Sequence, residues 1–260
     1  MNVLEIHNLC KSFGAVRVSR DICLSVAAHQ CHALIGPNGA GKTTLIHQIS
    51  GVLRPDAGQV LLDGHDITAQ PIWRRAQAGL GRTFQITSVL PSFSVRENVA
   101  LAAQAKAGSS MRFFAAASDE AALNRRAEAI LARICLEDRA DVLAADLSHG
   151  ERRLLELGIA LAGAPKFLLL DEPMAGLGRV ESAMLIEILA VLRREIPMLL
   201  VEHDMDAIFR LADTVSVLVE GAVVARGTPD QVRADPAARA AYLGEGTVGD
   251  PVGGTLGGTA

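Results

Sequence analysis

Residues 36–43 read Gly-Pro-Asn-Gly-Ala-Gly-Lys-Thr and fit the pattern G-x-x-x-x-G-K-[ST] without a mismatch. The apolar run at residues 31–35 precedes them and predicts a buried strand, while residues 43–50 read as a helix that Gly51 closes. Glycines let backbone N–H groups converge on phosphate oxygens, and a helix N-terminus adds positive potential. A strand, a glycine-rich turn and a helix in this order therefore predict a phosphate-binding loop rather than a plain turn with a surface lysine. Lys42 would reach the β- and γ-phosphates, and the Thr43 hydroxyl would ligate Mg²⁺.

An acidic pair follows a second buried strand. Residues 167–170 are apolar and lead into Asp171-Glu172-Pro173. A carboxylate at the end of a buried strand can hold the hydration shell of Mg²⁺, here Asp171, and Glu172 would then polarise an attacking water. By itself an Asp-Glu-Pro run is more often a turn. Together with the phosphate loop, it predicts a site for a nucleoside triphosphate.

Residues 148–151, Ser-His-Gly-Glu, come just before the apolar helical stretch 154–162. The pattern predicts a capping box, with Ser148 as N-cap and Glu151 reaching back from the third helical position. A capped helix N-terminus also attracts anions, so this segment could address a phosphate as well.

The chain has 260 residues, of which 50% are hydrophobic and 21% charged, so a sizeable core is expected and wholesale disorder is excluded. Strand-like and apolar runs precede Gln85, helical periodicity fills residues 94–164, and buried strands return afterwards. The pattern predicts an α/β core interrupted by a helical insertion. Further strands are expected at 3–6, 22–26, 60–62, 198–201, 214–219 and 223–225, and a helix break at 108–110. Residues 244–260 hold seven glycines and predict a flexible tail.

Composition excludes several classes of protein. A net charge of −4 and 3% aromatic residues argue against a dedicated nucleic-acid binder. No apolar run approaches the ~18 residues of a spanning helix, and the start lacks signal-peptide features, so a cytoplasmic location is expected. The cysteines are scattered without a CxxC pair, which predicts buried thiols rather than disulfides or a zinc site. They are Cys10, Cys23, Cys31 and Cys135.

The chain resembles the nucleotide-binding subunit of an ABC transporter in five segments. These are the phosphate loop, Gln85, residues 147–151, residues 168–172 and His203. They occur in the family's order, and the resemblance covers residues 3–244. It implies an ABC ATPase domain at 1–244, with ATP and Mg²⁺ as its cofactors. That domain would combine a P-loop NTPase (RecA-like) core and an antiparallel β subdomain with an inserted α-helical subdomain. The RecA-like core and the β subdomain would together occupy residues 1–84 and 165–240. The helical subdomain would occupy about 86–164, and residues 245–260 would form a flexible Gly-rich tail.

The resemblance also implies individual roles. Phe13 would stack on adenine, the alternative being a core phenylalanine. Gln85 would sense Mg²⁺ and the attacking water beside the contact with the membrane subunits. Residues 148–151 match the signature, which contacts the γ-phosphate held by the other subunit, residues 175–178 match the D-loop, and His203 matches the switch histidine. The implied catalytic residues are Glu172, His203 and Gln85; the implied metal ligands are Thr43, Gln85 and Asp171. The implied nucleotide-binding residues are Phe13, Gly36, Pro37, Asn38, Gly39, Ala40, Gly41, Lys42, Thr43, Thr44, Gln85, Ser148, His149, Gly150, Glu151 and Asp171.

The chain departs from the family pattern at three positions. His149 and Glu151 replace a glycine and a glutamine of the usual signature, and Gly178 stands where an aspartate or asparagine is frequent. Ser148 and Gly150 remain, so the part of the signature that faces phosphate is intact.

Four segments resemble the branched-chain amino acid importer group, specifically its LivG-type ATPase. They are residues 81–85, His149, residues 201–205 and residues 240–245. That resemblance implies a peripheral ATPase on the cytoplasmic face of the plasma membrane. Its partners would be a second ABC ATPase subunit, two membrane permeases and, indirectly, a periplasmic solute-binding protein, with no nucleic acid. Substrates of the group extend to urea, amides and aromatic acids.

Three alternatives stay open at this point. A lipopolysaccharide-export ATPase, which works as a homodimer, shares the ending at residues 242–245. A soluble ABC ATPase acting in DNA repair or on the ribosome is disfavoured by the single ATPase unit, the absence of a heptad run and the negative charge. A module that holds ATP without turnover is disfavoured by Glu172 and His203.

Overall fold

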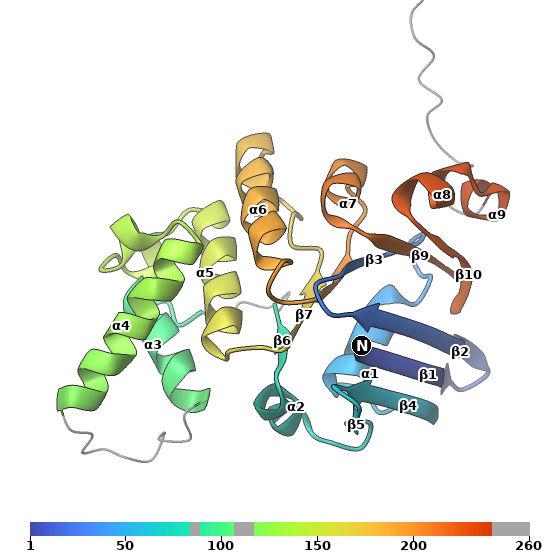
Figure 1. Ribbon diagram of the computed structural model, residues 1–260, viewed down its shortest axis with the longest axis horizontal. Helices are drawn as coiled ribbons and strands as arrows, with labels where there is room; N and C mark the ends of the chain where they lie inside the picture. Colours follow the sequence, from blue (N-terminus) through green and yellow to red (C-terminus); the bar gives the residue numbers. More distant parts are fainter. Residues whose placement is uncertain (84–88, 107–116, 241–260) are drawn as a thin grey trace, which may run out of the picture.

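The computed structural model describes residues 1–83, 89–106 and 117–240. The molecule contains two β-sheets, and helices pack against both of them (Figure 1). Gln85, the expected helix break at 108–110 and the glycine-rich tail lie outside the described residues.

The larger sheet has six strands in the order β10-β9-β3-β8-β7-β6. Neighbours from β9 to β6 run parallel, and β10 is antiparallel to β9. The strands are β3 (Cys31–Ile35), β6 (Leu80–Arg82), β7 (Phe167–Asp171), β8 (Met198–Val201), β9 (Thr214–Val219) and β10 (Ala222–Gly227). Because the strands from β9 to β6 are parallel, the segments that follow β3, β8 and β7 meet at one edge of the sheet.

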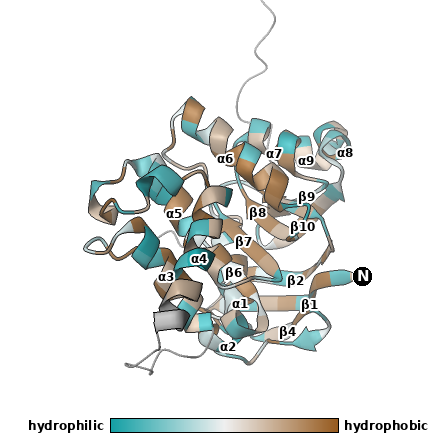
Figure 2. Cartoon of the chain, turned by 60° about the vertical axis from the view of Figure 1, so that its left-hand side comes forward, coloured by the Kyte–Doolittle hydropathy of each residue, from teal (hydrophilic) through white to brown (hydrophobic). Residues whose placement is uncertain are grey.

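Strands β7 and β8 are buried along their whole length, as expected for parallel strands covered on both faces. Successive side chains point to opposite faces, so Leu168 and Leu170 join a core with the helices while Phe167 and Leu169 join a second core. Both ribbons are largely brown in Figure 2. The central strands therefore contribute side chains to two hydrophobic cores, one on each face of the sheet.

The smaller sheet has the order β2-β1-β4-β5, with every pair antiparallel. Its strands are β1 (Asn2–Phe13), β2 (Val16–Ala27), β4 (Ala57–Leu62) and β5 (His65–Asp66). Buried residues of β1 such as Leu4 and Ile6 share the second core with Leu45 and Ile49 of the helix that follows the phosphate loop. The helix that follows the phosphate loop therefore packs against this smaller sheet.

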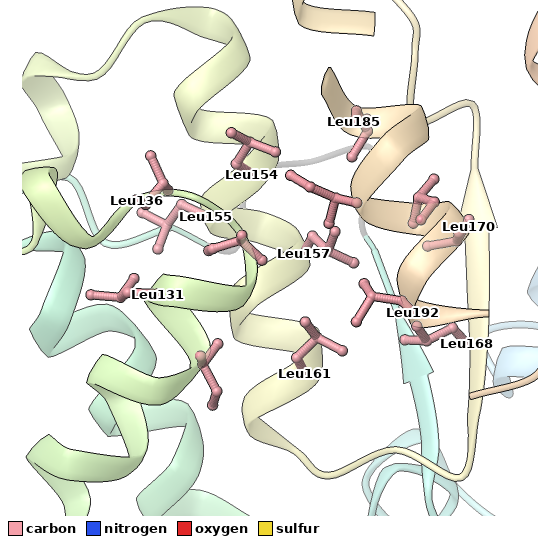
Figure 3. Close-up of a cluster of buried hydrophobic side chains, with 14 of the residues drawn as sticks. Leu131, Leu136, Leu154, Leu155, Leu157, Leu161, Leu168, Leu170, Leu185 and Leu192 are labelled. Carbon is pink, nitrogen blue, oxygen red and sulfur yellow. The ribbon is translucent and has the colours of Figure 1, made fainter. Parts of the chain in front are cut away.

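The helices complete both cores. They are α1 (Lys42–Ser50), α2 (Ile72–Ala78), α3 (Val95–Lys106), α4 (Ala117–Arg133), α5 (His149–Ala162), α6 (Arg179–Leu192), α7 (Met205–Leu211), α8 (Pro229–Ala234) and α9 (Pro236–Ala238), with short 3₁₀ turns at Glu137–Arg139 and Ala144–Asp146. Helices α3, α4 and α5 lie together at one side of the molecule (Figure 1). In Figure 3, leucines of α5 such as Leu157 and Leu161 lie between those of the neighbouring helices and those of α6 and β7. One continuous core thus joins the helical group to the large sheet.

All of the expected strands occur where the hydrophobic pattern places them, although β1 and β2 are much longer than predicted. Both continue through register shifts that interrupt the alternation of buried and exposed residues. The expectation that all the cysteines are buried is wrong. Only Cys31 is buried, whereas Cys23 and Cys135 are exposed, because they lie on the open face of β2 and at a turn with positive φ.

In the part of the chain that the structure describes, no helix is long and apolar enough to cross a membrane.

We predict that His32 makes the stability of the fold depend on pH. His32 is fully buried in β3, its Nε2 lies 2.9 Å from Ser216 Oγ, and burial lowers its pKa to about 3. Since the unfolded chain binds this proton below its ordinary pKa of about 6.5, the free energy of unfolding should fall as pH drops from about 6.5 towards 3. Between pH 7 and pH 5 the loss from this group should be up to about 2 kcal/mol. Urea unfolding at both pH values should show a smaller loss for His32→Gln than for the unchanged chain; equal losses would contradict the assignment.

Candidate functional site

The phosphate loop connects β3 to α1, and its shape requires glycine. Gly36 and Gly41 have φ of 157° and 104°. A Cβ on Gly36 would lie 2.1 Å from the carbonyl oxygen of Leu218, and one on Gly41 would lie 2.6 Å from that of Val18. The amide of Gly221 also donates to the Ala40 carbonyl at 2.9 Å. Backbone from β2, from β9 and from the β9–β10 turn therefore fixes the loop.

The other members of the loop sit as the motif requires. Ala40 is buried, Asn38, Gly39 and Thr43 are exposed, and Pro37 and Thr44 are half-buried. The exposed members leave one side of the loop open to a ligand. Thr43 is the second residue of α1, so its side chain starts at the helix N-terminus, where the helix potential is positive.

The side chain of Lys42 lies over the loop. Its Nζ donates to the carbonyl oxygens of Gly36 at 2.6 Å and Pro37 at 3.0 Å. Burial lowers the pKa of Lys42, while the negative charges of Glu172 and Asp171 oppose that shift. The ammonium therefore interacts electrostatically with both carboxylates, and its position over the loop is compatible with a contact to a bound phosphate.

Asp171 ends β7 and is only 3% exposed. Neither of its carboxylate oxygens has a hydrogen bond among the described residues, and the nearest cation, Arg82 Nη2, is 3.6 Å away. Burial raises its pKa, with Arg82 acting in the opposite direction. Two buried oxygens that lack hydrogen bonds, one of them in an ion pair with Arg82, fit a hard cation such as Mg²⁺, which prefers oxygen ligands.

Glu172 and His203 follow the next strands of the same sheet. Glu172 has a φ of 48°, and its amide donates to the Val201 carbonyl at 2.9 Å, which ties the end of β7 to β8. Glu202 is buried and accepts hydrogen bonds from the amides of Met174 and His203 at 2.8 and 3.0 Å. His203 itself is 64% exposed at the side chain. Because β8 lies between β3 and β7, the loop, Glu172 and His203 share one edge of the sheet.

Two residues here were not singled out from the sequence. Arg82 forms an ion pair with Asp171 and donates a hydrogen bond to Ser50 Oγ at 2.9 Å. Glu202 accepts hydrogen bonds from the segments that follow β7 and β8. The signal for Glu202 is a carboxylate directly after a buried apolar strand, the same pattern that identified Asp171. Arg82 has a weaker signal, a charge at the end of a three-residue strand.

The signature begins α5 and forms the predicted capping box. Ser148 Oγ accepts from the Glu151 amide at 3.2 Å, and Glu151 Oε2 accepts from the Ser148 amide at 2.8 Å. The ring of His149 packs beside Gly176, where a Cβ would lie 3.1 Å from its Nε2. The unusual histidine therefore fills the space over the D-loop segment. A cavity of about 220 Å³ opens beside Ser148, Gly150 and Glu151, and Arg139, Leu154 and Leu185 also line it.

Within the described residues, no hydrogen bond or ion pair joins the signature to the phosphate loop of the same chain. Figure 1 shows α5 beside α3 and α4, away from α1. Phe13, at the end of β1, is 51% exposed with Lys11 Nζ 5.7 Å from its ring centroid, so it is not a core phenylalanine. Gln85 lies outside the described residues. The candidate site residues thus fall into two separate groups. One group contains the phosphate loop with Lys42, Asp171, Glu172 and the end of β8, and the signature residues form the other.

Comparison with known proteins agrees with this geometry. Residues 19–175, more than half of the chain, match the family described as ABC transporter. The chain belongs to the ABC transporter family. It is an ATP-binding subunit that binds nucleotide and hydrolyses ATP, as subunits of this family do. Such ABC subunits dimerise and work with permeases. Residues 222–247 also match the family described as branched-chain amino acid ATP-binding cassette transporter.

Two kinds of relative are equally similar to this ABC subunit. The LivG branched-chain amino acid transport ATP-binding protein of Escherichia coli K12 is 34% identical, covering 94% of this chain and 98% of the relative. The LptB lipopolysaccharide export ATP-binding protein of Haemophilus influenzae is also 34% identical, with the same coverage. A crystal structure titled as the ADP conformation of an ATP-binding cassette of an ABC transporter has a TM-score of 0.82 and 30% identity, covering 94% of this chain and all of that one.

We predict that Lys42→Ala loses ATP binding while the fold persists. The variant removes the ammonium that lies over the loop and would reach the phosphates. Binding of a fluorescent ATP analogue should weaken by at least about tenfold, since a charge-assisted hydrogen bond contributes about 1.5–3 kcal/mol. Lys166→Ala, which breaks a surface ion pair with Asp63, serves as the control. Unchanged affinity in the Lys42 variant would refute the phosphate role.

Proposed function

We propose that this ABC subunit hydrolyses ATP to drive uptake of branched-chain amino acids or related small polar solutes through partner permeases. Urea, amides and aromatic acids are included among those solutes. The observation that carries the proposal is the match of residues 222–247 to the branched-chain amino acid family, because the rest of the chain is equally similar to importers and exporters. LivG and the BraF branched-chain amino acid transport protein of Pseudomonas aeruginosa, also 34% identical, support it.

The second candidate is a lipid or lipopolysaccharide exporter whose ATPase works as a homodimer. The 34% identity to LptB over nearly the whole chain supports it. In either case the ATPase lies peripherally at the cytoplasmic face of the membrane. Its RecA-like core and β subdomain would occupy 1–84 and 165–240, and its helical subdomain about 86–164.

We assign the mechanism to two composite sites. The phosphate loop of one subunit holds ATP through Lys42 and its backbone amides, and Phe13 stacks on adenine. The signature of the other subunit, Ser148 to Glu151, closes over the γ-phosphate. ATP is then a ligand that selects the closed dimer and is coupled reciprocally to the membrane subunits.

Hydrolysis requires a water oriented at the γ-phosphate. Glu172 is assigned as the residue that polarises this water, with His203 contacting the phosphate and Gln85 sensing both. Thr43, Asp171 and Gln85 would hold Mg²⁺, which when bound offsets charge on the phosphates. The hydrogen bond between the Glu172 amide and Val201 and the two bonds to Glu202 support these assignments, because they fix both loops to the sheet.

The permease contact is assigned to an apolar groove between α2 and α5. The groove has a volume of about 160 Å³ and includes Val52, Ile72 and Ile159. Ile72 and the adjacent Trp73 are exposed. Arg82, which pairs with Asp171, also lines the groove and would connect a bound permease to the ATP site.

Co-purification of the tagged chain from its native membranes tests the choice of transporter. A second, non-identical ABC ATPase with two permeases is the result expected for the importer. Recovery of a self-dimer with lipid-export components would overturn it in favour of the exporter.

We predict that Glu172→Gln keeps ATP binding while hydrolysis collapses. The amide cannot act as a base, and loss of a positioned base lowers rates by about 10²–10⁴-fold. ATP affinity and the rate of phosphate release are measured in the reconstituted assembly, with Glu195→Gln on the surface as control. Undiminished turnover would remove Glu172 from its assigned role.

A further inference from the structure

The signature of this chain carries a negative charge where the family usually has a neutral glutamine. The Ser148 amide and the guanidinium of Arg139 hold the pKa of Glu151 below its usual range, so the carboxylate is ionised at neutral pH. Its position in the first turn of α5 offsets the positive potential of the helix N-terminus. Glutamine would complete the capping box equally well without that charge.

A second carboxylate lies at the same end of α5. Glu181 Oε2 accepts from the Gly178 amide at 3.0 Å, and Glu181 Oε1 would lie 2.4 Å from a Cβ on Gly150. Two carboxylates therefore flank Ser148 and Gly150, the edge that under the proposed function meets the triphosphate held by the partner subunit. Like charges brought together across an interface weaken association.

Arg139 is the cation that pairs with Glu151. It ends the 3₁₀ turn Glu137–Arg139, and its Nε donates to Glu151 Oε1 at 2.7 Å. No other ion pair to Glu151 or Glu181 occurs within residues 1–83, 89–106 and 117–240. Arg139 also lines the cavity beside Ser148 and Gly150, so its charge lies at the same surface.

We propose that Arg139 is a positioning residue for the composite ATP site. It holds the Glu151 carboxylate against the 3₁₀ turn and offsets its negative charge. The repulsion between the Ser148–Gly150 edge and the phosphates of ATP bound by the partner subunit is thereby reduced. This inference rests on the proposed function, and it explains how the chain tolerates glutamate in its signature.

A double-mutant cycle tests the proposal in the assembly of the chain with its partner ATPase and permeases. The ATP concentration for half-maximal turnover is measured for the unchanged chain, Arg139→Gln, Glu151→Gln and the double variant. Arg139→Gln should raise that concentration about fivefold at low salt, with a smaller effect at high salt because screening weakens the repulsion. In the Glu151→Gln background the same substitution should change it less than about twofold. Arg139→Lys, which keeps the charge, should recover most of the loss.

Two further measurements separate positioning from folding. Binding of a fluorescent ATP analogue to the chain's own phosphate loop, and the melting temperature without nucleotide, should be unchanged in Arg139→Gln. Arg133→Gln is the matched control, since Arg133 makes a similar exposed pair with Glu195 at 2.6 Å away from the signature. An equal effect of Arg139→Gln in both backgrounds, or an effect no larger than that of Arg133→Gln, would overturn the inference. Absence of ATP turnover in the unchanged assembly would instead overturn the proposed function.

Discussion

The buried carboxylate of Asp171 is the constraint around which the proposed ATP site is arranged. Both oxygens lack hydrogen bonds among the described residues, and Arg82 at 3.6 Å is the nearest cation. Such a charge is costly to bury. β7 pairs with β6 on one side and β8 on the other, which holds this carboxylate in place at the end of the strand. That is the position which we propose for Mg²⁺ bound with ATP.

The rest of the site depends on the same sheet edge. Strands β3, β8 and β7 are consecutive and parallel, so the phosphate loop, His203 and Glu172 emerge together. The loop is shaped by carbonyl groups of Val18 and Leu218, and Glu202 pins the segments after β7 and β8. The signature instead caps α5 in the helical group, which suits a residue set that acts on the nucleotide of another subunit.

Local pattern was enough to predict the glycine-rich turn between β3 and α1, the carboxylate at the end of β7, the capping box and the buried strands β3, β7 and β8. Each of these depends on neighbours in sequence: a glycine spacing, an apolar run, or a serine three residues before a glutamate. Strands β5 and β6 and helices α2 and α6 to α9 were not predicted. Segments as short as β6 and α2, with three and seven residues, carry too little periodicity. Arg82 and Arg139 act through partners on other elements, and Glu202 through the distant amide of Met174, so no local pattern marks these contacts. Long-range contacts of this kind require coordinates.

We propose that Asp171 serves Mg²⁺ bound with ATP, and thermal unfolding with and without Mg²⁺ tests this role. The melting temperature of the unchanged chain should rise more with ATP and Mg²⁺ than with ATP and a chelator, because a ligand that binds only the folded state stabilises it. In Asp171→Asn the two conditions should give the same shift. A Mg²⁺-dependent shift of undiminished size in Asp171→Asn would contradict the account.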